Sequence, residues 1–155
     1  MNATPYLNEL ARWFSILKLD AVMIGNAAAV VHGAPVTTLD VDFMIEHTDE
    51  NYRKLAFLAQ QLNCQFIEMK LPGDNYMYRL KHRDDLVLLD FMYAAAGIKS
   101  FEAVKQNGTV VLFGEHPLTV ASLEDILASK RAAGRPKDMM SIPMLELTLN
   151  EKRKQ

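Results

Sequence analysis

Two aspartates separated by one residue, Asp40 and Asp42, have the type and spacing that point most directly to chemistry. They begin an apolar run typical of a β-strand, in which side chains two positions apart share a face, with Cα atoms roughly 6.5 Å apart. Carboxylates so placed repel each other, and burial adds to the cost of their charge. A divalent cation removes that cost, and Mg²⁺ favours one or two protein carboxylates together with phosphate oxygens and water. The structural alternative is that Asp40 caps a turn and Asp42 is solvated.

A Gly-Asn pair, Gly25-Asn26, follows the apolar run from Ala21 to Ile24 upstream of these aspartates. The pair is a turn signal, and Asn26 is expected to be the N-cap of a short helix that reaches Val31. Free backbone N–H groups at a helix start suit an anion such as a phosphate. The segment therefore joins a phosphate-binding turn to metal-binding carboxylates through one helix.

The stretch GNAAAVVHGAPVTTLDVDF, residues 25–43, resembles the signature of the nucleotidyltransferase superfamily (DNA polymerase β-like). It is most similar to a small bacterial branch grouped with the AbiE-type abortive-infection toxins. Members of that branch carry a Gly-Gly or Gly-Ser pair, a helix that ends in His-Gly, and then Thr-x-Asp-hydrophobic-Asp. The corresponding residues here are Gly25-Asn26, His32-Gly33 and Thr38-Leu39-Asp40-Val41-Asp42.

The sequence departs from this pattern at two positions. Asn26 replaces the second Gly or Ser, and Val36 stands where the family often has Arg, two residues before Thr38. If that Arg contacts the substrate in relatives, this chain lacks one positive charge. Both departures favour the alternative that the protein binds a nucleotide on this fold but has lost transfer.

The resemblance also implies a third carboxylate on a neighbouring strand, and Asp90 in the apolar segment LVLLDFM matches it. A buried carboxylate is costly unless it is paired or bound to metal. The structural alternatives for Asp90 are a cap at the strand end or an ion pair with an arginine. Asp84 and Asp85 are alternative matches, although they fall in a polar turn. Two Mg²⁺ ions held by Asp40, Asp42 and Asp90 are expected.

The segment ASKRAAGRPKDM, residues 128–139, also resembles the toxin-like branch, where K-x-x-A-x-R-x-K-D follows the third strand region. Lys130, Arg135 and Lys137 would hold a triphosphate or an RNA backbone. Their structural alternative is compensation of a helix dipole. Gly25, Asn26 and Thr38 would complete the nucleotide site, and Thr38 would either bind a phosphate or fix its loop. His32 is expected to pack or to bond the backbone.

The elements that must position these residues are those of an α+β fold. The resemblance implies a nucleotidyltransferase-like mixed β-sheet flanked by helices, with a C-terminal helical segment. One domain is expected over residues 1–155, with a core at about 21–120 and C-terminal helices at about 122–150. Pro143 is expected to kink the last helix or to restart it, with Ser141 as the cap. Strands are expected at residues 21–24, 41–45, 65–69, 76–81, 86–91, 109–113 and 117–120, with helices between and after them.

Composition limits the partners and the cellular compartment that are expected for this chain. The chain has 155 residues and a formal net charge of −2, so no global basic field indicates nucleic acid. Its one cysteine, Cys64, cannot form an internal disulfide, which fits a reducing cytoplasm. No apolar run approaches the length of about 18 residues that a membrane helix needs, and no membrane partner or secretion signal is expected.

Together these features predict a Mg²⁺-dependent nucleotidyltransferase that moves a nucleoside monophosphate from an NTP to an RNA (such as tRNA) or protein acceptor. The resemblance adds a role as a bacterial toxin with a cognate antitoxin. The alternatives are a catalytically weakened nucleotide-binding module and a protein-interaction module whose partner covers a sheet edge or the first helix.

Overall fold

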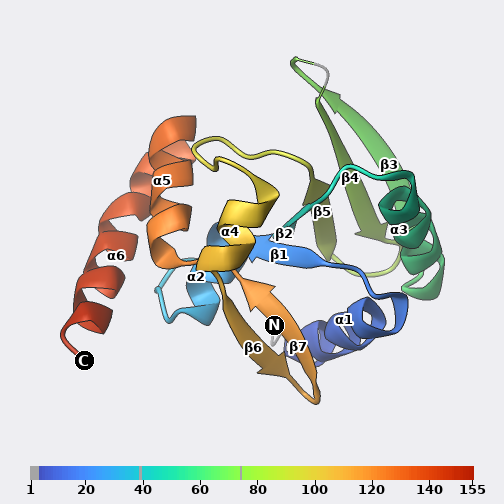
Figure 1. Cartoon of the computed structure of the whole chain (residues 1–155), viewed down its shortest axis with the longest axis horizontal. Coiled ribbons are helices and arrows are strands. Elements are labelled where there is room, and N and C mark those ends of the chain that lie inside the picture. The colour runs from blue at the N-terminus through green and yellow to red at the C-terminus, as the bar shows by residue number, and fades with distance from the viewer. Residues whose placement is uncertain (1–3, 39, 74) are drawn as a thin grey trace.

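A single mixed β-sheet organises the described part of the chain, which a computed structural model gives for residues 4–38, 40–73 and 75–155. Leu39 of the predicted motif lies outside these residues. Within them the strand order is β3-β4-β5-β2-β1-β7-β6 (Figure 1). Neighbouring strands run antiparallel except in the pairs β2–β5 and β1–β7, which are parallel. The strands are β1 (Ala21–Ile24), β2 (Asp40–Ile45), β3 (Cys64–Leu71), β4 (Asn75–His82), β5 (Leu88–Met92), β6 (Thr109–Phe113) and β7 (His116–Val120).

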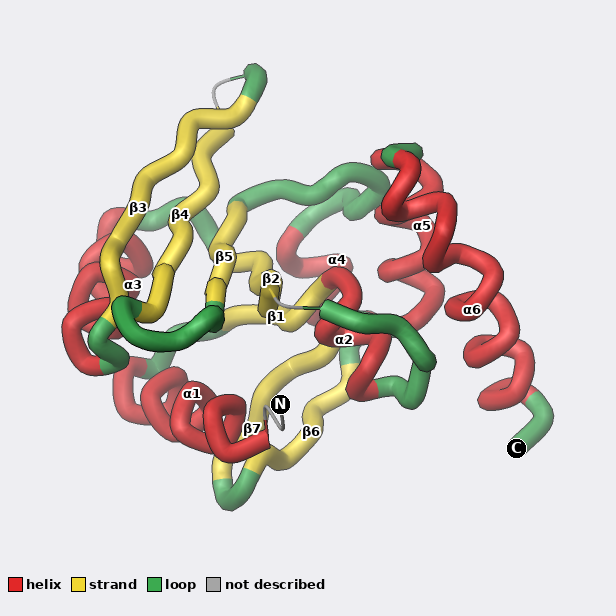
Figure 2. Tube along the Cα trace, turned by 180° about the vertical axis from the view of Figure 1, so that it is seen from behind, coloured by secondary structure: helices red, strands yellow, loops and turns green. Residues whose placement is uncertain are grey.

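Helices pack against the sheet, and two further helices lie at one end of the molecule. The helices are α1 (Thr4–Leu17), α2 (Gly25–Val31), α3 (Asp49–Gln61), α4 (Phe101–Asn107), α5 (Leu123–Ala133) and α6 (Pro136–Arg153). Opposite views show α5 and α6 packed together at the side of the molecule away from β3 and β4 (Figures 1 and 2). In the described residues no helix combines the length and the apolar character that crossing a membrane requires.

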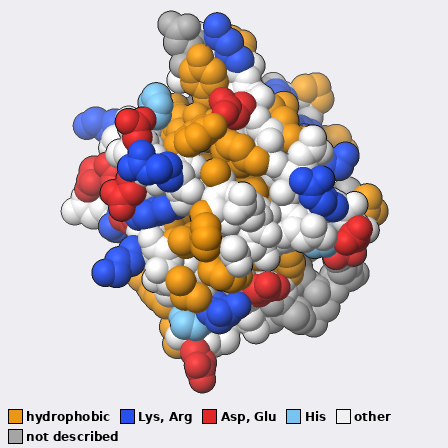
Figure 3. Space-filling view, turned by 90° about the vertical axis from the view of Figure 1, so that its right-hand side faces the viewer, with side chains coloured by type: hydrophobic (Ala, Val, Ile, Leu, Met, Phe, Trp, Pro, Cys, Tyr) orange, Lys and Arg blue, Asp and Glu red, His pale blue; other side chains and the backbone are white. Residues whose placement is uncertain are grey.

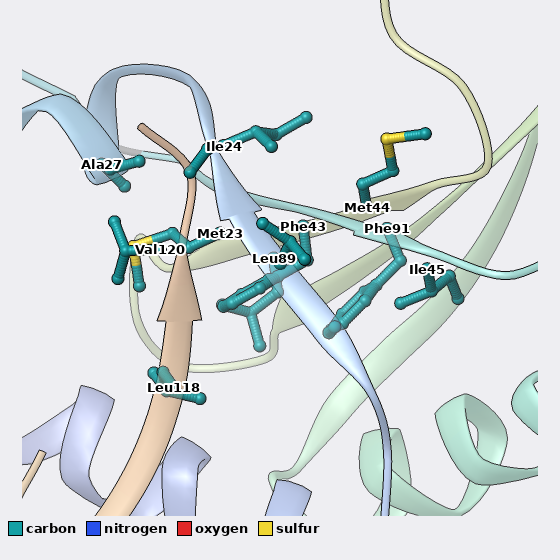
Figure 4. Packing of buried hydrophobic residues seen from close by; sticks show 14 of the residues in the cluster. Met23, Ile24, Ala27, Phe43, Met44, Ile45, Leu89, Phe91, Leu118 and Val120 are labelled. Carbon is teal, nitrogen blue, oxygen red and sulfur yellow. The ribbon is translucent and has the colours of Figure 1, made fainter. Parts of the chain in front are cut away.

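An aromatic cluster on one face of the sheet sets the orientation of the two central strands. Phe43 of β2 and Phe91 of β5 stack at a centroid distance of 5.3 Å (Figure 4). Phe14 of α1 packs against both rings. Successive side chains of a strand point to opposite faces. Asp42 and Asp90, one residue before each phenylalanine, therefore project from the other face of the sheet. Burial of the two rings in the core thus aims both carboxylates.

The α+β class and the order of the elements agree with the prediction, and several helix ends carry the residues that capping favours. Thr48 accepts a hydrogen bond from Asn51 N–H, and Ser122 accepts one from Asp125 N–H, so each caps its helix as a preferred N-cap residue does. Gly134 ends α5 in the left-handed conformation.

Three local predictions are wrong. Asn26 is not an N-cap, because α2 already begins at Gly25 and Asn26 Nδ2 donates to the Thr37 carbonyl at 3.3 Å. Strand β5 begins at Leu88 rather than Leu86, which is 79% exposed in the preceding turn. Pro143 does not restart the last helix, since α6 is continuous from Pro136 to Arg153.

The physical reason for the continuous α6 is that it is held on both sides of Pro143. Ser141, the predicted cap, lies inside α6 and donates its hydroxyl to the Asp138 carbonyl at 3.0 Å. Ile142 and Leu145 are buried where α6 packs on α5. This packing offsets the hydrogen bond that the proline cannot donate.

Apolar side chains also reach the surface on the side that carries α1 and α3, where they gather among scattered charges (Figure 3). Ile16 of α1 and Phe57 of α3 are exposed, and the Phe57 ring contacts Trp13 edge-on. Such a patch is a common feature of partner surfaces. A partner on the first helix stays a prediction, because nothing in the structure indicates what covers these residues.

Candidate active site

A row of charged side chains crosses the sheet on the face opposite the aromatic cluster. Arg79 of β4 is the register partner of Asp90 of β5, Asp90 is the partner of Asp42 of β2, and Asp42 is the partner of Ile24 of β1. Partners in register share a face, and neighbouring strands lie about 4.8 Å apart. The row therefore places Asp42 and Asp90 side by side, with Arg79 beyond one end and Gly25 directly after the other.

A cavity of about 600 Å³ lies over this row. Its floor holds the carboxylates, one wall comes from β3, β4 and the chain after β5, and the other wall comes from α5 and the start of α6. These segments lie far apart in the sequence, yet they meet around one space. Every residue predicted for the site lines it: Gly25, Asn26, Thr38, Asp40, Asp42, Asp90, Lys130 and Arg135.

Gly25 brings its backbone against the first pair of carboxylates. Its φ is +70°, in the left-handed region that favours glycine, and a Cβ atom built there would stand 2.9 Å from Asp42 Oδ2. No other residue type meets both conditions without displacing Asp42. The glycine of the predicted motif is therefore required by conformation and by space at this site.

Burial and acidic neighbours destabilise the charged form of Asp42 in the cavity. Burial, then Asp90, then Asp40 raise the pKa of Asp42 to about 6, and the charges of Lys137 and Lys130 only partly oppose this. A bound cation would remove the repulsion. Asp40 and Asp42 thus offer the hard oxygen ligands that Mg²⁺ favours. In the described residues, however, no three or more Asp, Glu, His or Cys side chains are arranged together to hold a metal ion.

The carboxylate of Asp90 is held by Arg79. Arg79 Nε donates to Asp90 Oδ1 at 2.8 Å and Arg79 Nη2 donates to Oδ2 at 3.0 Å, while Asp90 is only 3% exposed. The hydrogen bond to Asp90 is the main cause that raises the pKa of Arg79, which therefore stays charged. The ion pair with an arginine, one of the structural alternatives for Asp90, is thus present.

Arg79 is a residue of the cavity that sequence reasoning missed. The alternation of Tyr78 and Leu80 in β4 indicates that Arg79 faces the other side of the sheet, which was the available signal. Its partner depends on the register between β4 and β5, which no local pattern fixes. Asp84 and Asp85, the alternatives to Asp90, lie in the turn between these strands and do not line the cavity.

Thr38 stabilises the loop before β2 through two hydrogen bonds to the backbone of Asp40. Thr38 Oγ1 donates to the Asp40 carbonyl at 2.6 Å and accepts from Asp40 N–H at 3.2 Å, which matches the structural alternative for Thr38. Asn26 Oδ1 is buried beside this loop and has no hydrogen-bond partner among the described residues. A buried acceptor without a partner is costly, so Asn26 retains an acceptor for a ligand or water.

The α5–α6 wall supplies positive charge. Lys130 is 9% exposed, and its Nζ lies 3.7 Å from Asp138 Oδ1. Burial lowers the pKa of Lys130, although Asp138 partly opposes this. Arg135 is the N-cap residue just before α6 and donates through Nε to Asp138 Oδ2 at 2.7 Å. Lys137 also lines the cavity.

Asp138 forms ion pairs with both Lys130 and Arg135. Its burial acts to raise its pKa, but hydrogen bonds from Arg135 and the charges of Arg135 and Lys130 outweigh this and lower it. Asp138 is thus a buried carboxylate whose charge is already balanced. Its role is to fix the wall, since it holds both Lys130 and the first turn of α6.

His32 has the structural role that was expected. Its Nε2 lies 2.7 Å from the Ala121 carbonyl, and its Nδ1 lies 2.7 Å from Lys152 Nζ. A carbonyl only accepts and an ammonium only donates, so Nε2 carries the proton and Nδ1 accepts. His32 thereby fastens the end of α2 to β7 and to the C-terminal part of α6.

Comparison with known proteins gives structural similarity without sequence similarity. No family model matches the chain, and no curated protein matches its sequence. The solution structure of the antibiotic-resistance factor ANT(2'')-Ia matches with a TM-score of 0.65 at 15% identity, over 94% of this chain and 83% of that one. The crystal structure of ANT(2'')-Ia in complex with adenylyl-2''-tobramycin matches with a TM-score of 0.64 at 15% identity, over 99% and 92%.

A third match comes from Thermotoga maritima. TM1012, a candidate nucleotidyltransferase, matches with a TM-score of 0.55 at 16% identity, over 97% of this chain and 96% of that one. Likeness at such low identity establishes the fold alone, and the AbiE-type branch stays a prediction. The chain therefore has the nucleotidyltransferase fold that its Gly-Asn pair and paired aspartates predicted.

Proposed function

We propose that this protein is a Mg²⁺-dependent nucleotidyltransferase, which moves a nucleoside monophosphate from an NTP to an acceptor hydroxyl. The observation that carries the proposal is that Asp40, Asp42 and Asp90 converge on one cavity whose α5–α6 wall is cationic. Carboxylates for a cation and cations for phosphates are the two requirements of phosphoryl-type transfer. The fold supports the same reaction class, since ANT(2'')-Ia has been crystallised in complex with adenylyl-2''-tobramycin.

Asp40 and Asp42 would hold the cation. Their carboxylates fit because Asp42 is destabilised by burial and by its acidic neighbours, which a divalent ion would relieve. When bound, Mg²⁺ supplies positive charge for the leaving pyrophosphate and makes the acceptor hydroxyl more acidic. The expectation that Asp90 binds a second ion stays a prediction, because Arg79 uses both of its oxygens.

The other contribution to catalysis is the positioning of the substrates by residues of this chain. Lys130 and Lys137 face the carboxylates from the α5–α6 wall and would hold the triphosphate. The acceptor oxygen forms a bond to the α-phosphorus, and the bond from that phosphorus to the bridging oxygen of pyrophosphate breaks. The hydroxyl proton passes to the carboxylate cluster, and pyrophosphate leaves. Catalysis of this kind is mainly orientation and charge stabilisation.

Transfer of label tests the proposal. The protein is incubated with Mg²⁺, each NTP labelled at the α-phosphate, and total RNA or a protein extract, and label joined to acceptor is counted. We expect label with wild type and at least a hundredfold less with Asp40→Asn or Asp42→Asn. Asp85→Asn is the matched control, because Asp85 loses the same charge outside the cavity. Equal transfer by Asp42→Asn would contradict the proposal.

A finer proposal is that the transfer makes the protein a toxin with a cognate antitoxin. It rests on the resemblance of Gly25-Asn26 and the paired aspartates to the AbiE-type branch. Expression in a bacterium is then expected to arrest growth, and Asp40→Ala or Asp42→Ala is expected to restore it. Arrest that persists in both variants would remove the catalytic explanation. Nucleotide binding without transfer would instead favour the weakened nucleotide-binding module.

A further inference from the structure

Arg79 lies on the side of the carboxylates that the α5–α6 cations do not reach. The strand order β4-β5-β2-β1 puts Arg79 two strands from Asp42, a separation of about 10 Å. On the other side, β1 leads into α2, and α2 contacts α5 (Figure 1). The cavity therefore has two separate cationic positions, with the reacting centre of the proposed transfer between them.

Arg79 has hydrogen-bond capacity to spare. A guanidinium carries five N–H donors, and Arg79 uses one on Nε and one on Nη2 for Asp90. Three N–H groups remain on a side chain that is 27% exposed and lines the cavity. The two hydrogen bonds that Arg79 donates to Asp90 fix the plane of the guanidinium, so the remaining donors point in a set direction.

Some of the acidic side chains that line the cavity are already paired. Asp90 is paired with Arg79, and Asp138 is paired with Arg135 and Lys130. Among the described lining residues this leaves only Asp40 and Asp42 as acids without an ion pair, and the proposed cation would use both. The cavity thus offers no spare carboxylate for an amine-rich acceptor such as tobramycin.

We propose that Arg79 binds a phosphate group of the acceptor, and that Asp90 acts as the positioning residue that holds Arg79 for this contact. The inference rests on the proposed transfer and deepens it. The acceptor is then a molecule in which a phosphate ester neighbours the reacting hydroxyl, as in a ribonucleotide. Arg79 also supplies, from β4, a cation in a chain that has Val36 where the resemblance leads one to expect Arg.

The reaction balances with such an acceptor. The ribose hydroxyl oxygen bonds to the α-phosphorus of the NTP and a phosphodiester forms. The bond to pyrophosphate breaks, pyrophosphate carries away the electron pair, and the hydroxyl proton passes to the carboxylate cluster and then to water. Arg79 takes no part in bond making, since it binds the phosphate that is already present on the acceptor.

The experiment measures acceptor and nucleotide binding separately. A short single-stranded RNA with a free 3′ hydroxyl and a nucleoside 5′-monophosphate serve as two acceptors, and tobramycin serves as an amine-rich one. For Arg79→Gln we expect the acceptor KM to rise about ten- to a hundredfold, the usual effect of losing a charge-assisted contact. The Kd for the NTP, measured by calorimetry without acceptor, is expected to stay within twofold of wild type. Transfer to the monophosphate as well as to RNA would identify a single phosphate as sufficient, and transfer to RNA alone would identify the nucleic acid chain.

Three variants keep the result interpretable. Arg79→Lys retains a partner for buried Asp90 and is expected to fold, with a smaller rise in acceptor KM. Asp90→Asn combined with Arg79→Gln is expected to raise the acceptor KM little beyond the rise caused by Arg79→Gln alone, because both changes remove the same contact. Lys81→Gln is the charge-matched control, since Lys81 is exposed on the same strand and does not line the cavity.

Two results would overturn the inference while leaving the proposed transfer intact. One is an acceptor KM that is unchanged in both Arg79 variants, and the other is transfer of label to tobramycin or to a protein hydroxyl instead of a ribonucleotide. Failure of the wild type to bind any NTP would overturn the proposed function and the inference together, so the two failures are distinguishable.

Discussion

The backbone of Gly25 rests on the carboxylate of Asp42, because a Cβ atom at Gly25 would stand 2.9 Å from Asp42 Oδ2. This contact joins the two halves of the predicted motif in space. It makes the end of β1 one side of the carboxylate site, so the position of Asp42 depends on the smallest side chain. The effect of this close contact can be separated from the cost of placing a residue other than glycine in the left-handed conformation.

Gly25→Ala is expected to lower stability by more than the ~1–2 kcal/mol that the left-handed conformation costs, and to abolish Mg²⁺-dependent nucleotide binding. The matched control is Gly33→Ala, because Gly33 has a φ of +94° but a Cβ atom there would meet no atom within 4 Å. Gly33→Ala should therefore show the backbone cost and retain nucleotide binding. Chemical denaturation and calorimetry measure the two effects. Equal nucleotide affinity in the two variants would contradict a close contact at Asp42.

Asp42 predicts a specific dependence of stability on pH. Its pKa in the folded protein is about 6, above the ordinary value of 3.8, so the folded state binds this proton more tightly than the unfolded state. The stability this gives is present at low pH and is lost as pH rises from about 4 to about 6. Asp42→Asn never carries the buried charge. In EDTA it should be more stable than wild type at pH 7.5, by up to about 3 kcal/mol, with a smaller gain at pH 4.5.

The comparison of the two proteins at each pH cancels the titration of all other groups. Urea unfolding at both pH values gives the difference directly. A gain from Asp42→Asn that is larger at pH 4.5 than at pH 7.5 would show that Asp42 is not the strained carboxylate of the site.

Lys130 is expected to bind the triphosphate, because it is a nearly buried cation on the wall that faces the carboxylates. Lys130→Gln should weaken NTP binding about tenfold or more, the effect of one charge-assisted hydrogen bond. Arg131→Gln is the control, since Arg131 is the next residue of α5, carries the same charge and pairs at the surface with Glu146. Calorimetric titration with each NTP compares the variants, and equal affinities would exclude Lys130 from the nucleotide site.

Much of the fold and of the site follows from local pattern. The apolar runs before Gly25 and after Asp40 predicted strands β1 and β2, and the spacing of Asp40 and Asp42 predicted a shared face. Helix caps such as Ser122 and Gly134 were also predictable, because capping depends on residues within one turn of each other.

The parts that sequence could not predict depend on contacts between distant segments. The bond between Arg79 and Asp90 requires the register of β4 against β5, and the cationic wall requires α5 to dock beside α2. The continuity of α6 through Pro143 likewise depends on packing against α5 rather than on the local preference of proline. The N-cap prediction for Asn26 is wrong because helix α2 starts two residues earlier than the capping preference of Asn26 indicated.

The central claim is that Asp40 and Asp42 form a Mg²⁺-dependent nucleotide site. Thermal unfolding of wild type and Asp42→Asn, with each NTP and with or without Mg²⁺, tests it most directly. A ligand that binds the folded state at a hundred times its Kd stabilises it by about 2.7 kcal/mol. The account predicts a rise in the wild-type unfolding temperature that needs both NTP and Mg²⁺ and is lost in Asp42→Asn. No shift with any NTP at millimolar concentration, or an equal shift in Asp42→Asn, would contradict it.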